Sequence, residues 1–270
     1  MFGGDIRGGS VRQAGLVVAN TLGTTVSLGT DAKGAYAQLT AATAFATDAM
    51  LVVINTEAGD GSLKLIDISV GAAGSEVVIA PNLLYSNVSL IQDIGLYWLP
   101  VHIPAGSRIA ARGRSPSANG VARVMVQLIA TQMGCMTSRE RVLSYGISGS
   151  DGTSVDPGGT AHTKGAWVQL TGSTGAAVRA LVLGTSHQNN TTRDDALWLL
   201  DIGVGPAGSE NVVAANLMLT AESGSDLVSP PVIGPIFLNI PAGARIAARL
   251  QSSITGAADR TLALAAYGAS

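Results

Sequence analysis

Few side chains in this sequence have the type and spacing that catalysis would require. Four carboxylates recur at equivalent positions of two repeated segments, and they are Asp67, Glu76, Asp201 and Glu210. A pair of carboxylates could in principle hydrolyse a glycosidic bond. The neighbours of these four in the sequence are mainly glycine, serine and alanine, and no pattern predicts a cleft. We therefore expect the carboxylates to keep strand edges soluble or to accept hydrogen bonds in turns.

A glycine-rich motif at residues 203–208 matches the G-x-G-x-x-G pattern of dinucleotide-binding proteins by its letters alone. That pattern binds a pyrophosphate at the N-terminus of the helix that follows it. Here residues 209–213 have the character of a strand, and Ser69 replaces the first glycine in the equivalent turn of the other repeat. The motif therefore predicts a tight β-turn, and we expect no cofactor.

The three histidines, His102, His162 and His187, are not equivalent between the repeats and lack the spacing of metal ligands. The single cysteine, Cys135, cannot form a disulfide within the chain, and we interpret it as a small buried or linker residue. A polar segment at residues 187–195 could bind a metal or a sugar, but the corresponding segment of the other repeat differs entirely. We favour a solvated hairpin tip there, and the sequence predicts neither a metal site nor an enzyme.

Three blocks of sequence occur twice in the same order. They are found at residues 33–40 and 164–171, at 65–84 and 199–218, and at 103–112 and 240–249. The middle pair shares 13 of 20 positions and the last pair nine of ten. Their separation grows from 131 to 137 residues along the chain, as small loop insertions would produce. This period exceeds the roughly 20–50 residues of solenoid repeats, so each copy is large enough to be a domain with its own core.

Within each copy, short apolar segments of strand length alternate with glycine-rich turns. Residues 50–55 form an apolar run, and residues 63–70 place Ile66, Ile68 and Val70 on one face of a strand. About six to eight such strands per copy, roughly ten residues apart, predict a jelly-roll-like sandwich. The predicted fold class is all-β.

We expect two tandem homologous antiparallel β-sandwich domains and a Gly-rich N-terminal arm. The predicted boundaries are an arm at 1–13, a first copy at 14–134, a linker at 135–144 and a second copy at 145–270. Because a Gly-rich segment loses much conformational entropy on ordering, a partner chain is expected to order the arm.

The composition excludes several classes of protein. The chain has 270 residues, of which 47% are hydrophobic and 13% charged, with 34 glycines and a net charge of −2. The high apolar content argues against intrinsic disorder. The lack of a basic field argues against nucleic-acid binding by phosphate neutralisation. The sequence also lacks a run of about 18 consecutive apolar residues that could span a membrane as a helix.

The arginines are the charged residues that indicate a partner. The chain has 13 arginines and three lysines, and arginine is favoured in interface ion pairs because its guanidinium makes planar, forked contacts. Some of these arginines alternate with apolar residues along one strand, which predicts either a solvated face or a ridge that contacts a neighbouring subunit. The candidate partner-binding residues are Arg7, Arg12, Arg108, Arg112, Arg114, Arg245 and Arg249.

Two of the repeated blocks resemble structural proteins of tailed-bacteriophage virions. The resemblance rests on residues 67–84 (DISVGAAGSEVVIAPNLL) and 103–112 (IPAGSRIAAR) and extends over most of both copies. It implies a non-enzymatic β-sandwich protein that acts by binding and is located in the virion after assembly in the host cytoplasm. Capsid decoration (cement) proteins, head fibres and tail-tip components belong to this group, and no catalytic role is carried over with these residues.

The function expected from this resemblance is decoration or cementing of the capsid lattice by an oligomer. Few charges and many small apolar residues suit large symmetric contacts. Three chains with two similar domains each would present six quasi-equivalent units. The expected partners are phage coat or tail proteins and further copies of the chain, as a homotrimer or another homo-oligomer, with no nucleic acid and no membrane.

The alternative function is that of a tail-fibre or tail-tip adhesin that binds host-surface glycans. An adhesin would need exposed aromatic platforms for sugars. We expect Trp98, Trp167 and Trp198 to pack in the core instead, because two of them lie in predicted strands and the third matches a tyrosine of the other copy.

Overall fold

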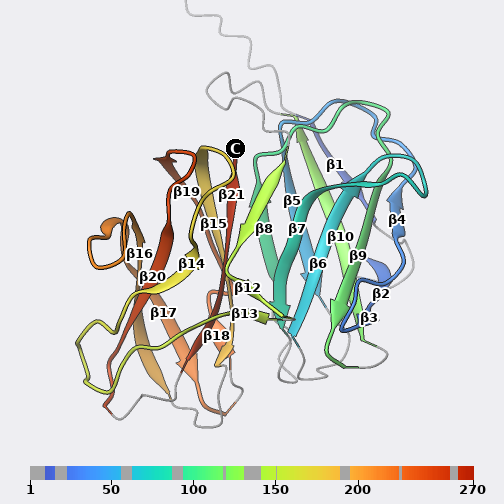
Figure 1. Ribbon diagram of the computed structural model, residues 1–270. Coiled ribbons are helices and arrows are strands. Elements are labelled where there is room, and N and C mark those ends of the chain that lie inside the picture. The colour runs from blue at the N-terminus through green and yellow to red at the C-terminus, as the bar shows by residue number, and fades with distance from the viewer. Residues whose placement is uncertain are drawn as a thin grey trace, which may run out of the picture.

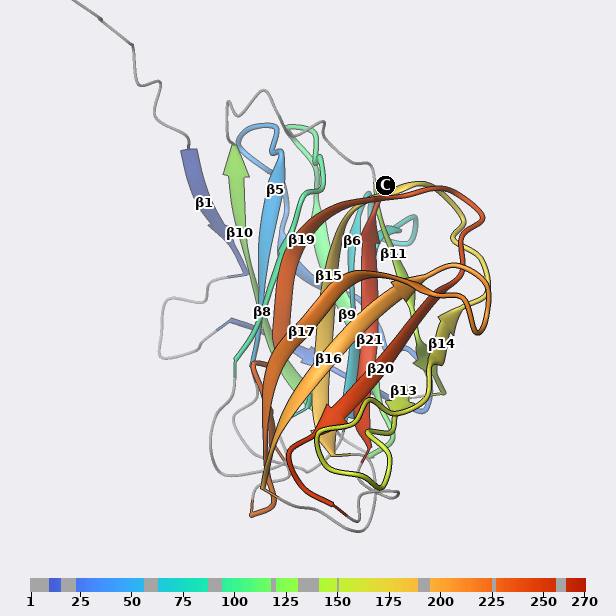
Figure 2. The ribbon, with the colours of Figure 1, turned by 90° about the vertical axis from the view of Figure 1, so that its left-hand side faces the viewer.

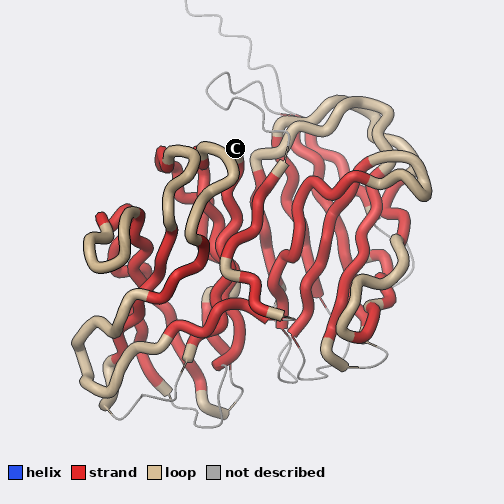
Figure 3. The backbone as a smooth tube through the Cα atoms, in the orientation of Figure 1, coloured by secondary structure: helices blue, strands red, loops and turns tan. Residues whose placement is uncertain are grey.

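The apolar segments and glycine-rich turns of the sequence fold into strands joined by loops, as Figure 3 shows for the computed structural model. The structure describes residues 10–15, 23–55, 63–86, 94–117, 120–130, 141–149, 151–188, 195–224, 227–255 and 261–270. These residues contain no helix, so the predicted all-β class is confirmed. It follows that none of them belongs to a helix long and apolar enough to cross a membrane.

The first half of the chain forms two five-stranded sheets, which together make the first sandwich (Figure 1). Sheet 1A contains β1 (Ser10–Ala14), β2 (Thr24–Ser27), β5 (Ala49–Asn55), β8 (Gly95–Leu99) and β10 (Val121–Ala130). Sheet 1B contains β3 (Gly29–Thr30), β4 (Ala37–Thr40), β6 (Leu63–Val70), β7 (Val77–Ser86) and β9 (Ile109–Ser115). The strand orders are β1-β10-β5-β8, with β2 also on β10, and β3-β9-β6-β7, with β4 also on β9.

The second half forms the second sandwich, which lies beside the first (Figure 1). Sheet 2A contains β11 (Val142–Tyr145), β12 (Ile147–Ser148), β13 (Asp151–Val155), β15 (Val178–Gln188), β19 (Val232–Ile240) and β21 (Leu262–Ala269). Sheet 2B contains β14 (Val168–Thr171), β16 (Ala196–Val204), β17 (Asn211–Glu222), β18 (Leu227–Ser229) and β20 (Ile246–Ser252). The orders are β12-β13-β21-β15-β19, with β11 also on β21, and β14-β20-β16-β17-β18.

The two sandwiches share one arrangement of strands. The series β4-β9-β6-β7 corresponds to β14-β20-β16-β17, and β10-β5-β8 corresponds to β21-β15-β19. Among the described residues, every strand pairing joins two strands of the same sandwich, and all pairings are antiparallel except that of β3 with β9. The described residues contain ten strands in the first half and eleven in the second. These are more than expected from the sequence, because two-residue strands such as β3 and β12 leave no hydrophobic period.

The strands begin earlier than the predicted boundaries. Strand β1 starts at Ser10 and pairs with β10, so the end of the predicted arm belongs to sheet 1A. Strand β11 likewise starts at Val142, inside the predicted linker. Residues 1–9 and 131–140 lie outside the described residues, and the remaining predictions for the arm and the linker concern those segments.

Strand β21 explains how the two sandwiches join. All eight of its residues are buried, the pattern of a strand covered on both faces. Leu262, Leu264 and Ala266 pack in the core of the second sandwich. Ala265 and Tyr267 alternate with them and belong to the core cluster of the first sandwich. Sheet 2A therefore covers the second core with one face and contacts the first sandwich with the other (Figure 2).

Candidate functional site

The three repeated sequence blocks meet in space, and they do so once in each sandwich. The first block supplies a lysine, the second an aspartate and the third an arginine. These residues are Lys33, Asp67 and Arg112 in the first sandwich and Lys164, Asp201 and Arg249 in the second. The two groups are called here the first and second Asp clusters. Their formation gives the repetition of three separate blocks a common structural reason.

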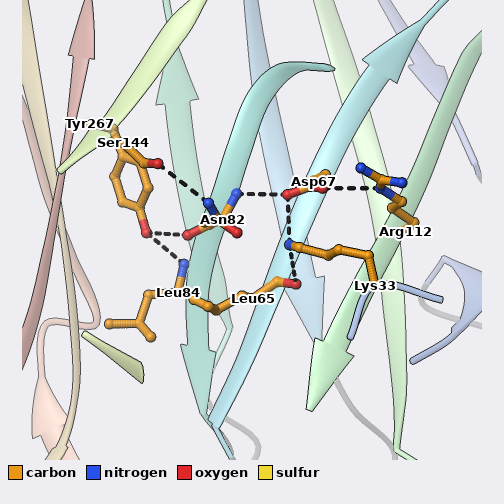
Figure 4. A network of polar contacts seen from close by, with 8 residues as sticks. All are labelled: Lys33, Leu65, Asp67, Asn82, Leu84, Arg112, Ser144 and Tyr267. Atoms are coloured by element: carbon orange, nitrogen blue, oxygen red, sulfur yellow. Dashed lines mark hydrogen bonds and ion pairs between the residues drawn. The ribbon is translucent and has the colours of Figure 1, made fainter. Parts of the chain in front are cut away.

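In the first Asp cluster, Asp67 lies on β6, between β9 and β7, and is 3% exposed (Figure 4). Its Oδ1 accepts hydrogen bonds from Lys33 Nζ at 2.6 Å and from the Asn82 backbone amide at 2.8 Å. Its Oδ2 accepts one from Arg112 Nε at 3.1 Å. Lys33 Nζ also donates to the Leu65 carbonyl at 3.0 Å. Both carboxylate oxygens are thus occupied by donors from three other parts of the chain.

A β-bulge directs the backbone amide toward this carboxylate. The register between β6 and β7 shifts between Ile66 and Ile68, and Asn82 on β7 has a φ of 54°. Asparagine tolerates this left-handed conformation better than most residues. The second Asp cluster has the same local geometry, because Asn216 also has a φ of 54° and its backbone amide donates to Asp201 Oδ1 at 2.8 Å.

The second Asp cluster repeats the first almost atom for atom. Lys164 Nζ donates to Asp201 Oδ1 at 2.8 Å, and Arg249 Nε donates to Oδ2 at 2.9 Å. Each arginine also stacks on an aromatic ring from the first block. The guanidinium of Arg249 lies 4.5 Å from the Trp167 ring centroid, and the equivalent Arg112–Tyr36 distance is 4.6 Å. Such cation–π contacts stabilise the charged arginine.

A second ion pair borders each cluster at the turn that follows the aspartate strand. Arg108 donates to Glu76 Oε1 at 2.8 Å and to Gln38 Oε1 at 3.0 Å, while the Gly74 amide donates to Glu76 Oε2 at 2.9 Å. The counterpart is Arg245, which donates to Glu210 at 2.7 Å and to a glutamine at 2.9 Å. These pairs connect the tight turn to the third block.

Burial and hydrogen bonding act in opposite directions on these carboxylates. Burial alone would raise the pKa of Asp201, but hydrogen bonds from the lysine, the Asn216 amide and the arginine hold it below its ordinary value. The pKa values of Glu76 and Glu210 are lowered as well, because turn amides and the paired arginine outweigh burial. Burial lowers the pKa of Lys33, although Asp67 opposes that shift. The clusters are built to hold charges in place within the fold.

Four of the sequence-predicted partner residues lie in the Asp clusters or in the ion pairs that border them. Arg108 and Arg112 contact carboxylates of the first sandwich, and Arg245 and Arg249 those of the second. The arginines do alternate along one face of a strand, as expected, but on this face they form ion pairs with carboxylates of the same chain. Partner binding by the same arginines stays a prediction.

The remaining predicted partner residues are not part of the clusters. Arg12 is exposed on β1, opposite Leu128. Arg114 lies on β9 with its buried Nε unpartnered among the described residues. Arg7 lies outside the residues that the structure describes.

Several expectations can be compared directly with the structure. The glycine motif at 203–208 begins in the last residues of β16 and continues into the predicted tight turn before β17, so a strand stands where the dinucleotide motif requires a helix. Asp67 and Asp201 were expected at strand edges, which is wrong, since each is buried on a strand with neighbours on both sides. The turn hydrogen bonds expected of the glutamates are seen at Glu76.

The aromatic residues divide between core and surface. Trp198 is fully buried, as expected, whereas Trp98 is half-buried. Trp167 is also half-buried and lies under Arg249. Among the described residues, no group of three or more histidine, cysteine, aspartate or glutamate side chains could hold a metal ion. Most of the polar segment 187–195 lies outside those residues.

Sequence reasoning missed the lysine and the aromatic residue of each cluster. Their signal was present, because Lys33 and Tyr36 recur as Lys164 and Trp167 in the shortest block. The sequence does not show which of these residues pair with each other, since Asp67 lies 34 residues from its lysine and 45 from its arginine. The signal that could have indicated one shared site is that all three blocks occur in both copies.

Comparisons with known proteins identify no relative by sequence. No family model matches the chain, and no curated protein matches it. Among solved structures, the STIV major capsid protein aligns with a TM-score of 0.37 and 8% identity, over 96% of each chain. PNGase F, a glycosylasparaginase from Flavobacterium meningosepticum, aligns with a TM-score of 0.36 and 11% identity, over 97% of this chain and 96% of its own. The IBDV T13 viral particle gives a TM-score of 0.26 and 15% identity, over 85% of this chain and 60% of the other.

Proposed function

We propose that the chain is a non-enzymatic structural protein of a tailed-bacteriophage virion that decorates or cements the capsid lattice as a homo-oligomer. This proposal rests on the structural role of the repeated residues. The blocks that recur supply buried strands and two saturated ion-pair clusters, and both carboxylate oxygens of Asp67 and Asp201 already accept hydrogen bonds. The repeated residues therefore maintain two similar surfaces, as a lattice-binding protein needs.

Composition and resemblance support the same role. The chain carries few charges and many small apolar residues, which suits surfaces that are covered repeatedly by neighbours. Residues 67–84 and 103–112 resemble segments of phage virion proteins, and these segments provide the strands and turns of the first Asp cluster. A non-enzymatic role agrees with this use of the segments.

The direct test is the location and copy number of the protein in purified particles. Quantitative mass spectrometry of intact particles should find the chain at a fixed, high ratio to the coat protein. Mild dissociation should release it before the shell breaks. Absence from the particle, or a few copies confined to one vertex, would overturn the decoration role.

The adhesin alternative rests on the two stacked aromatic residues. Tyr36 and Trp167 are half-buried beneath arginines whose side chains are 31% and 29% exposed. A planar ring beside a guanidinium could contact a sugar. Binding to a glycan array that is lost in Trp167→Ala and kept in Trp198→Phe would favour this function over lattice decoration.

A further inference from the structure

The centre of the outer face of sheet 1A is mainly apolar and only half-buried. Side chains alternate across a strand, and the central residues of β5 and β10 turned away from the first core are Leu51, Val53, Met125, Gln127 and Ile129, with the polar pair Asn55 and Arg123 at one end of the same face. The five central residues are of intermediate exposure, whereas the residues between them are buried. The neighbouring strand β8 adds an exposed leucine and a half-buried tryptophan to this face.

The equivalent face of the second sandwich is covered within the chain along β15 and β21, whereas Phe237 on the neighbouring strand β19 stays 62% exposed. Val182 pairs with Tyr267 on sheet 2A as Leu51 pairs with Gln127 on sheet 1A. Val182 is 2% exposed and Tyr267 is 0% exposed. The covering element is the edge of the first sandwich, formed by β7 and β8. Tyr267 Oη accepts a hydrogen bond from the Leu84 amide at 2.7 Å and donates to the Asn82 carbonyl at 2.8 Å (Figure 4).

The second sandwich has an equivalent edge on β17 around residues 216–218, because β18 pairs only with residues 220–222 of that strand and Asn216 and Met218 before them are exposed. By the repeat, Asn216 and Met218 on β17 correspond to Asn82 and Leu84 on β7. Leu84 is 1% exposed, whereas Met218 is 64% exposed. Both asparagines have a φ of 54°, so the two edges share the same local backbone geometry. The chain therefore exposes both kinds of surface that form its internal junction. The first sandwich exposes an apolar face, and the second sandwich exposes the edge that fits such a face.

We propose that the β17 and β19 edge of one chain packs on the outer face of sheet 1A of a second copy. The contact reproduces between chains the junction that joins the two sandwiches within a chain. It deepens the proposed function, because it names the surfaces through which the homo-oligomer forms.

Hydrogen-bonding groups support this pairing. Gln127 occupies the position of Tyr267, and its amide carries both an acceptor and a donor, as the tyrosine hydroxyl does. It can accept from the Met218 amide and donate to the Asn216 carbonyl. Within the chain, the Asn82 side chain also donates to Ser144 Oγ at 3.4 Å.

The polar contact at Ser144 has a counterpart in the same two surfaces. Strand register places Gln13 at the position of Ser144, because Ala14 pairs with Val126 as Tyr145 pairs with Ala266. Gln13 and Asn216 are both exposed. A second amide pair is thus available beside the first.

Side-chain sizes are also compatible across the proposed contact. In the internal junction, Gly184 on the face leaves room for the Tyr97 hydroxyl at the edge. In the proposed contact, the face carries the larger Val53 and the edge carries the smaller Ile233, which strand register places at the position of Tyr97. A larger residue on one side is matched by a smaller residue on the other.

This contact is heterologous, since it joins different surfaces of two identical chains. Such contacts close into rings when the rotation permits and otherwise continue as filaments. Either assembly uses each surface once per chain. A symmetric dimer through one surface alone would leave the complementary surface uncovered and is not what we expect.

The first test measures self-association of the purified full-length chain by sedimentation velocity over a range of concentrations. Met218→Asp at the edge and Gln127→Glu on the face should each weaken association at least roughly tenfold, because each places an unpaired charge in the contact. Gln127→Glu keeps the shape of the side chain while removing its donor. Val77→Asp is the matched control, since Val77 is 63% exposed on β7 and lies outside both proposed surfaces.

The second test identifies the paired surfaces by cross-linking. Gln127→Cys and Met218→Cys are made in separate chains on a Cys135→Ser background and treated with a short bis-maleimide. A cross-linked dimer should form when the two variants are mixed and not when either is treated alone. Cross-linking of one variant to itself, or wild-type chains that remain monomeric, would overturn the inference. Thermal unfolding of each variant shows whether the fold is kept.

The outcomes separate this inference from the proposed function. A protein found throughout the capsid but without association through these surfaces would refute the contact and leave the decoration role standing. A chain that assembles as described but is absent from particles would refute the role and leave the contact standing.

Discussion

Tyr97 and Tyr267 meet edge to face across the junction of the two sandwiches, with ring centroids 5.4 Å apart and ring planes at 88°. Both side chains are fully buried. Their hydroxyls share one strand edge, because Tyr97 Oη donates to the Leu84 carbonyl at 2.5 Å and Tyr267 Oη accepts from the Leu84 amide. Burial raises the pKa of both phenols. The junction thus combines aromatic packing with hydrogen bonds to an otherwise open strand edge.

Tyr267→Phe tests the polar part of this junction. The variant keeps the ring but leaves the Leu84 amide and the Asn82 carbonyl without their partner, so the free energy of unfolding should fall by about 1–3 kcal/mol. Chemical denaturation measures the change. Tyr36→Phe is the control, since the ring of Tyr36 stacks under Arg112 at the surface. Equal stability of the two variants would contradict a role for the Tyr267 hydroxyl.

Asp67→Asn tests the first Asp cluster. The variant leaves Lys33 and Arg112 without their countercharge, and breaking a buried pair in this way typically costs about 3–5 kcal/mol. Because the Arg112 side chain is 31% exposed and solvent screens it, we expect a loss of about 2–3 kcal/mol. A double-mutant cycle with Lys33→Met, followed by denaturation, should give a coupling of about 1–2 kcal/mol.

The equivalent cluster supplies an internal check on that result. Asp201→Asn should cost about as much as Asp67→Asn, because the two carboxylates accept the same set of hydrogen bonds. Zero coupling in the cycle, or a large difference between the two variants, would show that the clusters do not act as equivalent structural units.

Much of the fold follows from sequence patterns, because strand periodicity and turn residues are local. The apolar run at 50–55 and the alternation at 63–70 correspond to β5 and β6. The burial of Asp67 could not be predicted in this way. Its own strand gives it the character of an exposed position, and the residues that cover it lie 34 and 45 positions away in the sequence.

The junction between the sandwiches was also beyond local patterns. Residues 262–269 are uniformly apolar, which indicates a strand buried on both faces but does not name the second covering layer. That layer is the edge formed by β7 and β8, and the Tyr267 hydroxyl spans 183 residues of sequence to reach Leu84. The repeat predicts two similar halves, whereas the differences between them determine how the halves meet.

Asp151→Asn tests a carboxylate whose pKa burial raises, to about 6. Since the ordinary pKa is 3.8, the folded state holds this proton more tightly than the unfolded state. The stability that the group contributes is therefore present below about pH 4 and is lost as the pH rises through about 6. The variant should gain about 1–2 kcal/mol over wild type at pH 7, allowing for partial exposure, and nothing at pH 4.

Denaturation curves at several pH values measure that difference. Asp195→Asn, at an exposed aspartate that also accepts a backbone amide hydrogen bond, is the matched surface substitution measured alongside Asp151→Asn. A stability gain at Asp151 that is the same at pH 4 and pH 7 would contradict the raised pKa.

Gly184→Ala tests how closely the two sandwiches approach each other. A Cβ at this position would overlap the Tyr97 hydroxyl and lie 3.2 Å from Cε2 of Tyr267. We expect the free energy of unfolding to fall by about 1–3 kcal/mol, as overpacking of a filled core does. Gly159→Ala, where nothing lies within 4 Å of the added carbon, should be nearly neutral. In a Tyr97→Phe background the hydroxyl is gone, so the cost of Gly184→Ala should shrink by about 1 kcal/mol or more. Strictly additive effects of the two substitutions in denaturation experiments would mean that the glycine is not required by the tyrosine.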